Sequence, residues 1–165
     1  MNRALSLLSA RALSVSELRT KLKLRAASAA DIDGVIVKLT DAGYLNDQRM
    51  AESFAAARIE NQSQGRMRVL RDLRARRVSP EVAEGAVTEA FREVDETALI
   101  ETFLARKFRG KDLGALLKDE RQLASAFRKL RTAGFGTSNS IKVLKRFASQ
   151  AELLEEEPED DSDPQ

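Results

Sequence analysis

Arginine is the residue type whose number and spacing point most clearly to a chemistry in this sequence. Residues 58–77 hold seven arginines and two acidic residues. At helical spacing Leu70 and Leu73 share one side of the segment 66–77, so its arginines project around the remaining surface. A guanidinium is a planar group with five donors that match the oxygens of phosphates and carboxylates. The segment is therefore predicted to contact a nucleic-acid backbone or an acidic protein surface.

Two other segments carry basic residues at corresponding positions. In the more N-terminal segment, Arg19 and Lys23 share a helical face. In the more C-terminal segment, Arg128 begins a basic run. Three basic helices in register would form one continuous binding strip, whereas solvated faces with i,i+4 pairs are the alternative for any single helix. The predicted phosphate-binding residues are Arg19, Lys23, Arg25, Arg58, Arg66, Arg68, Arg71, Arg74, Arg76, Arg77, Arg128, Lys129 and Arg131.

Catalysis and base-specific readout are not indicated. The sequence has neither cysteine nor histidine, which excludes thiol nucleophiles, imidazole bases and the usual zinc ligands. Adjacent acids such as Asp95 and Glu96 are too close to share a helical face and stand where helix starts favour acids. Aromatic residues do not interleave with the arginines, as stacking on unpaired bases would require. We expect no enzymatic activity, no cofactor and no metal.

The charge is distributed unevenly along the chain. Residues 1–150 carry 28 basic and 18 acidic residues, a net charge of +10, whereas the last fifteen residues contain eight acids and no base. Like-charge repulsion, two prolines and few apolar residues predict that residues 151–165 form a disordered acidic tail. The tail is either a solubility extension or an internal competitor for the basic surface.

The rest of the sequence predicts helices. Only three prolines and eight glycines occur, and apolar residues recur at spacings of three and four. Strand signals are missing, and neither a signal peptide nor an 18-residue apolar stretch is found. We expect an all-α, soluble, cytoplasmic protein that makes no membrane contact.

Caps set the predicted helix boundaries. Ser14-Val15-Ser16-Glu17 is a capping box, and Ser28 with Asp31 repeats its chemistry. Gly43 is predicted to end one helix, because glycine adopts the left-handed conformation most readily. Further helices are predicted to start at Asn46, Ser79, Asp95 and Asp119, and the last two to cover 120–132 and 138–150.

Three segments share one design, in which a basic helix is followed by a turn and a helix with an apolar face. They begin at Leu18, Leu70 and Phe127, about fifty residues apart. A repeat of this length cannot bury its own apolar stripe and needs its neighbours. Residues 1–150 are therefore predicted to form an elongated, curved array of repeats at about 3–45, 46–93 and 94–150, and we expect a monomer. Chance similarity among amphipathic helices is the alternative.

One nine-residue block carries a family signature. Residues 43–51, Gly-Tyr-Leu-Asn-Asp-Gln-Arg-Met-Ala, resemble the Gly-Tyr-Leu-Asp-Asp-x-Arg-Phe-Ala segment of the RecX regulatory family. The opening helix with its Ser-x-x-Glu-Leu-x-x-Lys-Leu sequence and the arginine-rich stretch after Gly65 are similar to the same family. The resemblance covers residues 3–150 and is most specific over 14–91.

The sequence departs from this pattern at four positions. Asn46, Gln48 and Met50 keep the capping, polar and apolar character of the residues they replace. Arg77 stands where the family normally has glycine, which would relieve the turn before Val78. We expect the signature to be structural, with Tyr44 and Leu45 stapling the end of one helix to the next.

The resemblance implies an all-helical array of three three-helix repeats that modulates the bacterial RecA recombinase. It implies binding in the groove of the RecA–DNA filament, which hinders ATP hydrolysis, strand exchange and cleavage of the LexA repressor, and so regulates homologous recombination and the SOS response. The alternative is a helical protein that binds single- or double-stranded DNA directly, without RecA. The predicted basic residues would contact the filament or its phosphates in either case.

Overall fold

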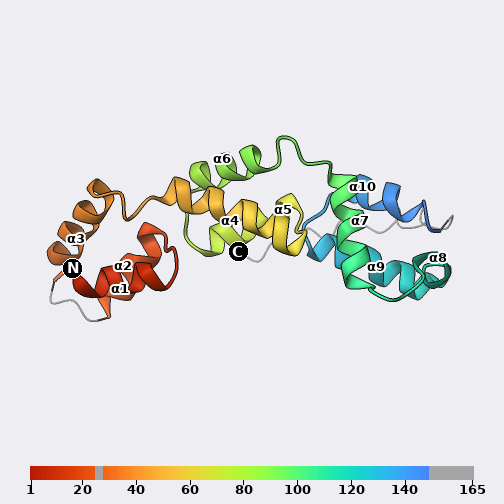
Figure 1. The fold of residues 1–165 in the computed structure, drawn as a ribbon, viewed down its shortest axis with the longest axis horizontal. Coiled ribbons are helices and arrows are strands. Elements are labelled where there is room, and N and C mark those ends of the chain that lie inside the picture. The colour runs from red at the N-terminus through yellow and green to blue at the C-terminus, as the bar shows by residue number, and fades with distance from the viewer. Residues whose placement is uncertain (25–27, 149–165) are drawn as a thin grey trace. The chain divides into compact units, whose positions relative to one another are not determined.

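The computed structural model describes residues 1–24 and 28–148, in which every regular element is a helix (Figure 1). This confirms the predicted all-α class for the described residues. Arg25 and the predicted tail at 151–165 lie outside the described residues. The helices are α1 (Asn2–Ala10), α2 (Val15–Lys23), α3 (Ala29–Asp41), α4 (Asp47–Gln62), α5 (Arg66–Ala75), α6 (Pro80–Ala90), α7 (Glu96–Lys107), α8 (Leu113–Leu116), α9 (Glu120–Thr132) and α10 (Thr137–Leu144).

The predicted caps begin these helices. The Ser14 hydroxyl accepts from the Glu17 N–H at 3.0 Å, and the Glu17 carboxylate accepts from the Ser14 N–H at 2.9 Å, which completes the capping box. Asp95 caps α7, and its pKa is lowered because the Thr97 hydroxyl and nearby backbone amides donate to its carboxylate. At four further helix starts, a side-chain oxygen accepts a hydrogen bond from a backbone N–H group; the capping residues are Ser28, Asn46, Ser79 and Asp119.

Two helix ends differ in how well they match the sequence prediction. Gly43 follows α3 with a φ of 73°, as expected. The last helix was predicted to reach residue 150, but α10 ends at Leu144, and residues 149 and 150 lie outside the described part. The chain turns there with i,i+3 hydrogen bonds at Arg146 and Phe147, and Ala148 packs into the core with 7 % exposure. Packing of Phe147 and Ala148 against the core has overridden helical periodicity.

Buried apolar residues form three clusters that divide the helices into groups. The first group is α1–α3, around Leu18, Ile36 and Leu39; the second is α4–α6, around Val69 and Leu73. The third is α7–α10, and its cluster includes Ile100, Leu104, Phe127, Leu130 and Phe135. The third group differs from a three-helix repeat because it contains an additional short helix, α8. Every group therefore has its own core, in which a fully buried leucine contributes roughly 1.5–3 kcal/mol. The expectation that a repeat cannot bury its own apolar stripe is wrong for these groups.

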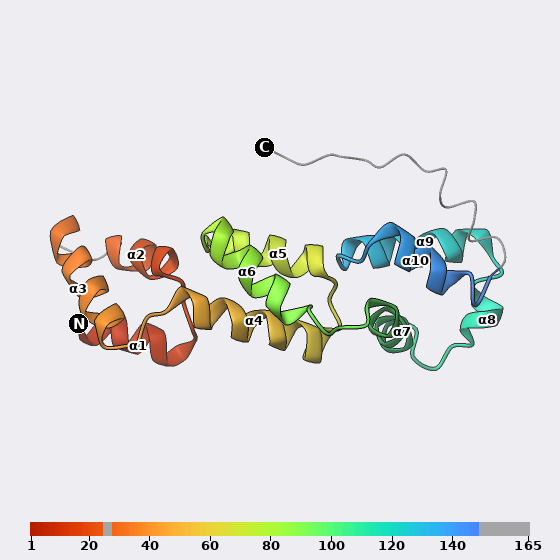
Figure 2. The same cartoon turned by 90° about the horizontal axis from the view of Figure 1, so that it is seen from above.

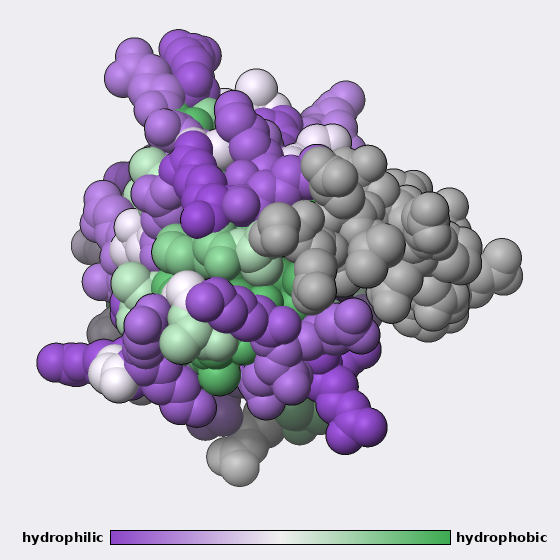
Figure 3. Space-filling model, turned by 90° about the vertical axis from the view of Figure 1, so that its right-hand side faces the viewer, coloured by the Kyte–Doolittle hydropathy of each residue, from purple (hydrophilic) through white to green (hydrophobic). Residues whose placement is uncertain are grey.

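The chain divides into two compact units. Unit 1 comprises residues 1–61 and 69–93, which hold the first two helix groups (Figure 2, red to green). Unit 2 joins residues 62–68, hereafter the 62–68 segment, to the third group from residue 94 on. At the end of the third group, apolar side chains reach the surface between hydrophilic ones (Figure 3). The predicted repeat boundaries and the elongated, curved arrangement stay predictions.

The signature residues Tyr44 and Leu45 behave differently from one another. Leu45 is buried in the first cluster as expected, but Tyr44 is 64 % exposed, so the predicted stapling role of Tyr44 is wrong. Both amides donate to the Leu39 carbonyl oxygen, at 2.9 Å and 3.1 Å. This tight turn after Gly43 directs the side chains of two adjacent residues to opposite sides, and only one of them reaches the core.

Among residues 1–24 and 28–148, no helix is both long enough and apolar enough to cross a bilayer. The same residues contain no group of three acids that could hold a metal ion.

Candidate polyanion-binding site

Helix α5 presents most of its arginines to solvent. Val69 and Leu73 are fully buried, and this side of the helix packs on the second cluster. Arg71 and Arg74 are exposed, and Arg66 is exposed at the start of the helix. The helix therefore combines a buried apolar side with a basic face, as predicted, but Val69 is fully buried with Leu73, whereas the predicted Leu70 is only partly buried.

On this face, the charge of Arg74 is only weakly compensated. Arg74 pairs with Glu84 at 3.2 Å, but the two side chains are 54 % and 58 % exposed, so the pair contributes little and can open. Arg58 is held more firmly, because its guanidinium lies 4.7 Å from the centre of the Phe54 ring and 3.8 Å from Asp72. Arg74, whose pair with Glu84 can open, therefore keeps its positive charge accessible to an anionic partner.

Arg76 is part of the fold. Its side chain is 16 % exposed and donates to both carboxylate oxygens of Glu17 and, at 2.6 Å, to the Ala12 carbonyl oxygen. The Arg76 carbonyl oxygen in turn accepts from the Ser14 hydroxyl at 2.8 Å. These bonds connect the second helix group to the first, and the guanidinium also lies over the Phe54 ring. We therefore leave Arg76 out of the proposed contact residues.

Glu17 responds to this arrangement through its pKa. Burial raises the pKa of the Glu17 carboxyl, but hydrogen bonds from Arg76 and the Ser14 amide, together with the charges of Arg76 and Arg11, outweigh burial. The pKa of Glu17 is therefore lowered from its ordinary value of 4.5. The carboxylate form is the one that holds the two groups together.

Arg77 stands where the family resemblance led us to expect a glycine. Its φ is 57°, in the left-handed region, and its N–H donates to the Arg74 carbonyl oxygen at 2.8 Å where α5 ends. Its guanidinium donates to the Thr20 hydroxyl at 3.0 Å, although the residue as a whole is exposed. The arginine thus fills a glycine conformation and adds a second contact between the first two groups.

The basic residues of α2 and α9 are also on the surface, with varied partners. Arg19 pairs with Asp33, whereas Lys23 is exposed at the end of α2. Arg128 is exposed on α9, and Arg131 donates to the Phe135 carbonyl oxygen at 3.0 Å. Lys129 donates to the Ser125 hydroxyl at 2.7 Å and lies 5.3 Å from the centre of the Phe108 ring. Both helices can offer ammonium or guanidinium groups to an anion.

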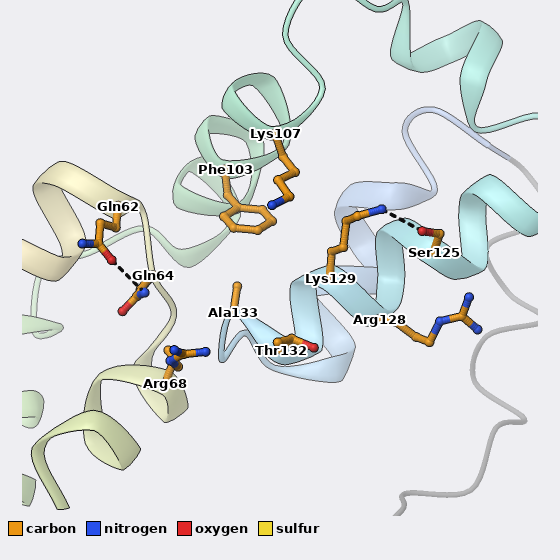
Figure 4. A pocket seen from close by; sticks show the side chains of 10 residues that line it. All are labelled: Gln62, Gln64, Arg68, Phe103, Lys107, Ser125, Arg128, Lys129, Thr132 and Ala133. Atoms are coloured by element: carbon orange, nitrogen blue, oxygen red, sulfur yellow. Dashed lines mark hydrogen bonds between the residues drawn. The ribbon is translucent and has the colours of Figure 1, made fainter. Parts of the chain in front are cut away.

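A pocket in unit 2 collects basic residues that the sequence pattern did not connect. It has a volume of about 430 Å³ and lies among the 62–68 segment, α7 and α9 (Figure 4). Arg68, Arg128 and Lys129 belong to the predicted set, but Lys107 does not. Lys107 stands in the last turn of α7, where basic residues are common, so its spacing gave no signal. Phe103, one helical turn earlier, also lines the pocket.

The fold and the exposed basic faces define a class. Small helix groups, each with its own core and with basic residues on the surface, define a helical protein built from small modules. Family models narrow this class: the first three-helix domain of RecX matches residues 1–39, and the second three-helix domain of RecX matches residues 46–87.

Whole-chain relatives agree with these matches. "Regulatory protein RecX" of Trichlorobacter lovleyi is 35 % identical over 132 residues, which cover 80 % of each chain. The protein of the same name from Pelodictyon phaeoclathratiforme is 30 % identical over 164 residues, covering 99 % of this chain and 94 % of that one. The chain belongs to the RecX family of regulatory proteins. Family membership implies a regulator of RecA.

A solved structure shares the fold. The crystal structure of RecX from Lactobacillus salivarius superposes with a TM-score of 0.71 at 20 % identity, covering 88 % of this chain and 92 % of that chain. At this identity the likeness concerns the fold alone.

Proposed function

We propose that this protein binds the groove of the RecA–DNA filament and thereby inhibits RecA ATP hydrolysis, strand exchange and LexA cleavage. It acts by binding and catalyses no reaction of its own, and it moderates homologous recombination and the SOS response. RecA binding and this set of inhibited activities are what membership of the RecX family suggests.

The observation that carries the proposal is the basic face of α5. Arg71 and Arg74 are exposed beside a helix side that is buried by Val69 and Leu73, so the cations cannot turn inward. A groove lined by phosphates and acidic side chains would attract such a face and hold it through charge-assisted hydrogen bonds.

The proposed contact residues are the predicted set without Arg76. Arg25 remains in that set on sequence grounds only. The set is Arg19, Lys23, Arg25, Arg58, Arg66, Arg68, Arg71, Arg74, Arg77, Arg128, Lys129 and Arg131.

Charge reversal on α5 tests the proposal. The triple variant Arg68→Glu, Arg71→Glu and Arg74→Glu should raise the concentration needed to inhibit single-strand-dependent ATP hydrolysis by RecA by at least about tenfold, because three phosphate or carboxylate contacts become repulsive. Its circular dichroism should match the parent protein. Reversal of three exposed basic residues outside the set provides a control with the same change of charge: Arg109, Lys111 and Arg121.

Four outcomes would count against the proposal. ATP hydrolysis that is unaffected by an equimolar amount of the parent protein would exclude inhibition of RecA. Equal loss of inhibition in the control variant would show that net charge, and not the α5 face, determines binding. Loss of helicity in the α5 variant would assign these arginines to the fold. Tight binding of duplex DNA at physiological salt without RecA would favour the direct DNA-binding alternative.

A further inference from the structure

The pocket of unit 2 has a lining of unusual charge. Four of its ten lining residues are basic and none is acidic. Lys107 and Arg128 make no ion pair with any residue that the structure describes, and the partners of Lys129 there are a hydroxyl and an aromatic ring. Cations gathered without carboxylates raise the local concentration of anions. The pocket is therefore suited to an anionic ligand.

One wall of the pocket is aromatic. The Phe103 ring lies beside Lys107 and close to Ala133, on the side of the pocket formed by α7 (Figure 4). Phe135 contacts the Phe103 ring edge to face, with centroids 5.6 Å apart and planes at 69°, which fixes the orientation of Phe103. A fixed ring beside ammonium groups is the arrangement with which proteins bind single-stranded nucleic acid, since every base has a face that can stack.

The opposite wall is held in place by the backbone. The Gly65 N–H donates to the Ala133 carbonyl oxygen at 2.8 Å, and the Met67 N–H donates to the Gly134 carbonyl oxygen at 3.1 Å. These bonds fix the 62–68 segment against the end of α9, so that Gln62, Gln64 and Arg68 line the pocket in a defined position. A preformed wall reduces the ordering cost of binding.

We propose that this pocket binds one nucleotide of a single-stranded nucleic acid. The phosphate lies near Lys107 and Lys129, the base lies against the Phe103 ring, and the side chains of Ser125 and Thr132 offer hydroxyls to the sugar and phosphate. A volume of about 430 Å³ falls in the usual range for small-ligand sites. An acidic peptide would satisfy the cations but would leave the aromatic wall without a partner, so we assign the pocket to a nucleotide.

This inference shares Arg68, Arg128 and Lys129 with the proposed function, but it is tested without RecA, so the two can fail separately. The measurement is fluorescence anisotropy of a labelled twelve-nucleotide thymidine oligomer with the full chain. An oligomer of equal length and charge with abasic residues is the matched ligand. We expect the thymidine oligomer to bind about fivefold or more tightly than the abasic oligomer, because stacking is absent from the second.

Variants then assign the contacts. Phe103→Leu should remove the difference between the two oligomers, whereas Phe147→Leu, which changes a partly buried ring of the same cluster outside the pocket, should preserve it. Lys107→Gln should weaken both oligomers and lower the slope of log affinity against log salt by about 0.7, the value for one single-strand phosphate contact. Lys111→Gln, at an exposed lysine outside the pocket, should leave the slope unchanged.

The proposal would be overturned by equal binding of the two oligomers to the parent protein, a comparison that needs no variant to fold. It would also be overturned if Lys107→Gln and Lys111→Gln behaved alike. The third contrary result concerns a glutamate peptide that displaces the thymidine oligomer and binds Phe103→Leu as tightly as the parent protein. If Phe103→Leu also keeps the preference for the thymidine oligomer over the abasic one, the pocket would be assigned to an acidic protein segment.

Discussion

Gly65 and Gly134 meet backbone against backbone within unit 2. A Cβ atom added to Gly65 would lie 2.4 Å from the carbonyl carbon of Gly134, and one added to Gly134 would lie 2.1 Å from the Arg68 nitrogen. Gly134 also has a φ of 90°. Only glycine satisfies both the close approach and this conformation. The pair therefore fixes the 62–68 segment to the turn between α9 and α10.

Gly65→Ala should separate these two segments. The new methyl group overlaps backbone atoms that cannot move aside, which costs about 1–3 kcal/mol or more. We expect a lower urea midpoint and faster hydrogen exchange of the Met67 amide. Gly85→Ala is the matched control, because a Cβ at Gly85 in α6 meets nothing within 4 Å and should stabilise the helix by about 0.5–1 kcal/mol. Equal effects of the two substitutions would show that the glycine contact is unimportant.

The Glu17–Arg76 pair should couple the first two helix groups energetically. A double-mutant cycle with Glu17→Gln and Arg76→Gln is expected to give an interaction of about 1–3 kcal/mol, since the pair is largely shielded and charge-assisted. The matching cycle with Arg74→Gln and Glu84→Gln should give less than about 0.5 kcal/mol, because both side chains are exposed. Urea unfolding measures both cycles. Similar coupling in the two would contradict the structural role of Arg76.

Acid should destabilise unit 1 partly through Glu17. The folded pKa of Glu17 lies below its ordinary value of 4.5, so the unfolded chain binds this proton more readily. The contribution of Glu17 to stability is complete above that value and is lost as the pH falls through the folded pKa. Urea midpoints from pH 7 to pH 3 should therefore fall less steeply for Glu17→Gln than for the parent protein. Parallel curves would exclude this linkage.

Arg77 offers a direct measure of backbone strain. Arg77→Gly and Arg77→Ala both remove the hydrogen bond to Thr20, but only glycine adopts a φ of 57° without cost. The glycine variant should therefore be more stable than the alanine variant by about 1 kcal/mol. Thermal unfolding of the two variants gives the difference. An alanine variant of equal or greater stability would mean that the left-handed conformation stores no strain.

Removal of residues 152–165 tests the internal-competitor interpretation of the tail. The deletion removes eight acids, and the remaining chain carries 28 basic and 18 acidic residues. If the tail competes for the basic faces, binding of the RecA filament should become several-fold tighter at low salt, and the gain should disappear near 1 M salt, where exposed charges are screened. Unchanged affinity at low salt would favour the solubility extension.

Local chemistry made most of the helices predictable. The capping box at Ser14, the turn at Gly43 and the proline after Ser79 each depend on a few neighbouring residues, which a sequence displays directly. The periodicity of α5 likewise predicted an arginine face. Tyr44 was misassigned because a turn decides which of two adjacent side chains reaches the core.

The roles of individual basic residues could not be predicted in this way, because they depend on contacts made in the folded chain. In a list of basic residues Arg76 and Arg74 look equivalent, yet one connects two helix groups and the other forms an exposed pair. Lys107 had no signal in the sequence, because its place in the pocket depends on α9 and on the 62–68 segment.

The amino-acid sequence by itself determined the helical class, the helix starts, the excess of positive charge and the family, because all four depend on residue types and on spacings within a few turns. Only the tertiary structure decided which arginines are part of the fold, which glycines touch and which cations surround one aromatic ring. Those properties depend on contacts between residues dozens of positions apart, and the packing of apolar side chains, which many sequences can satisfy, sets such contacts.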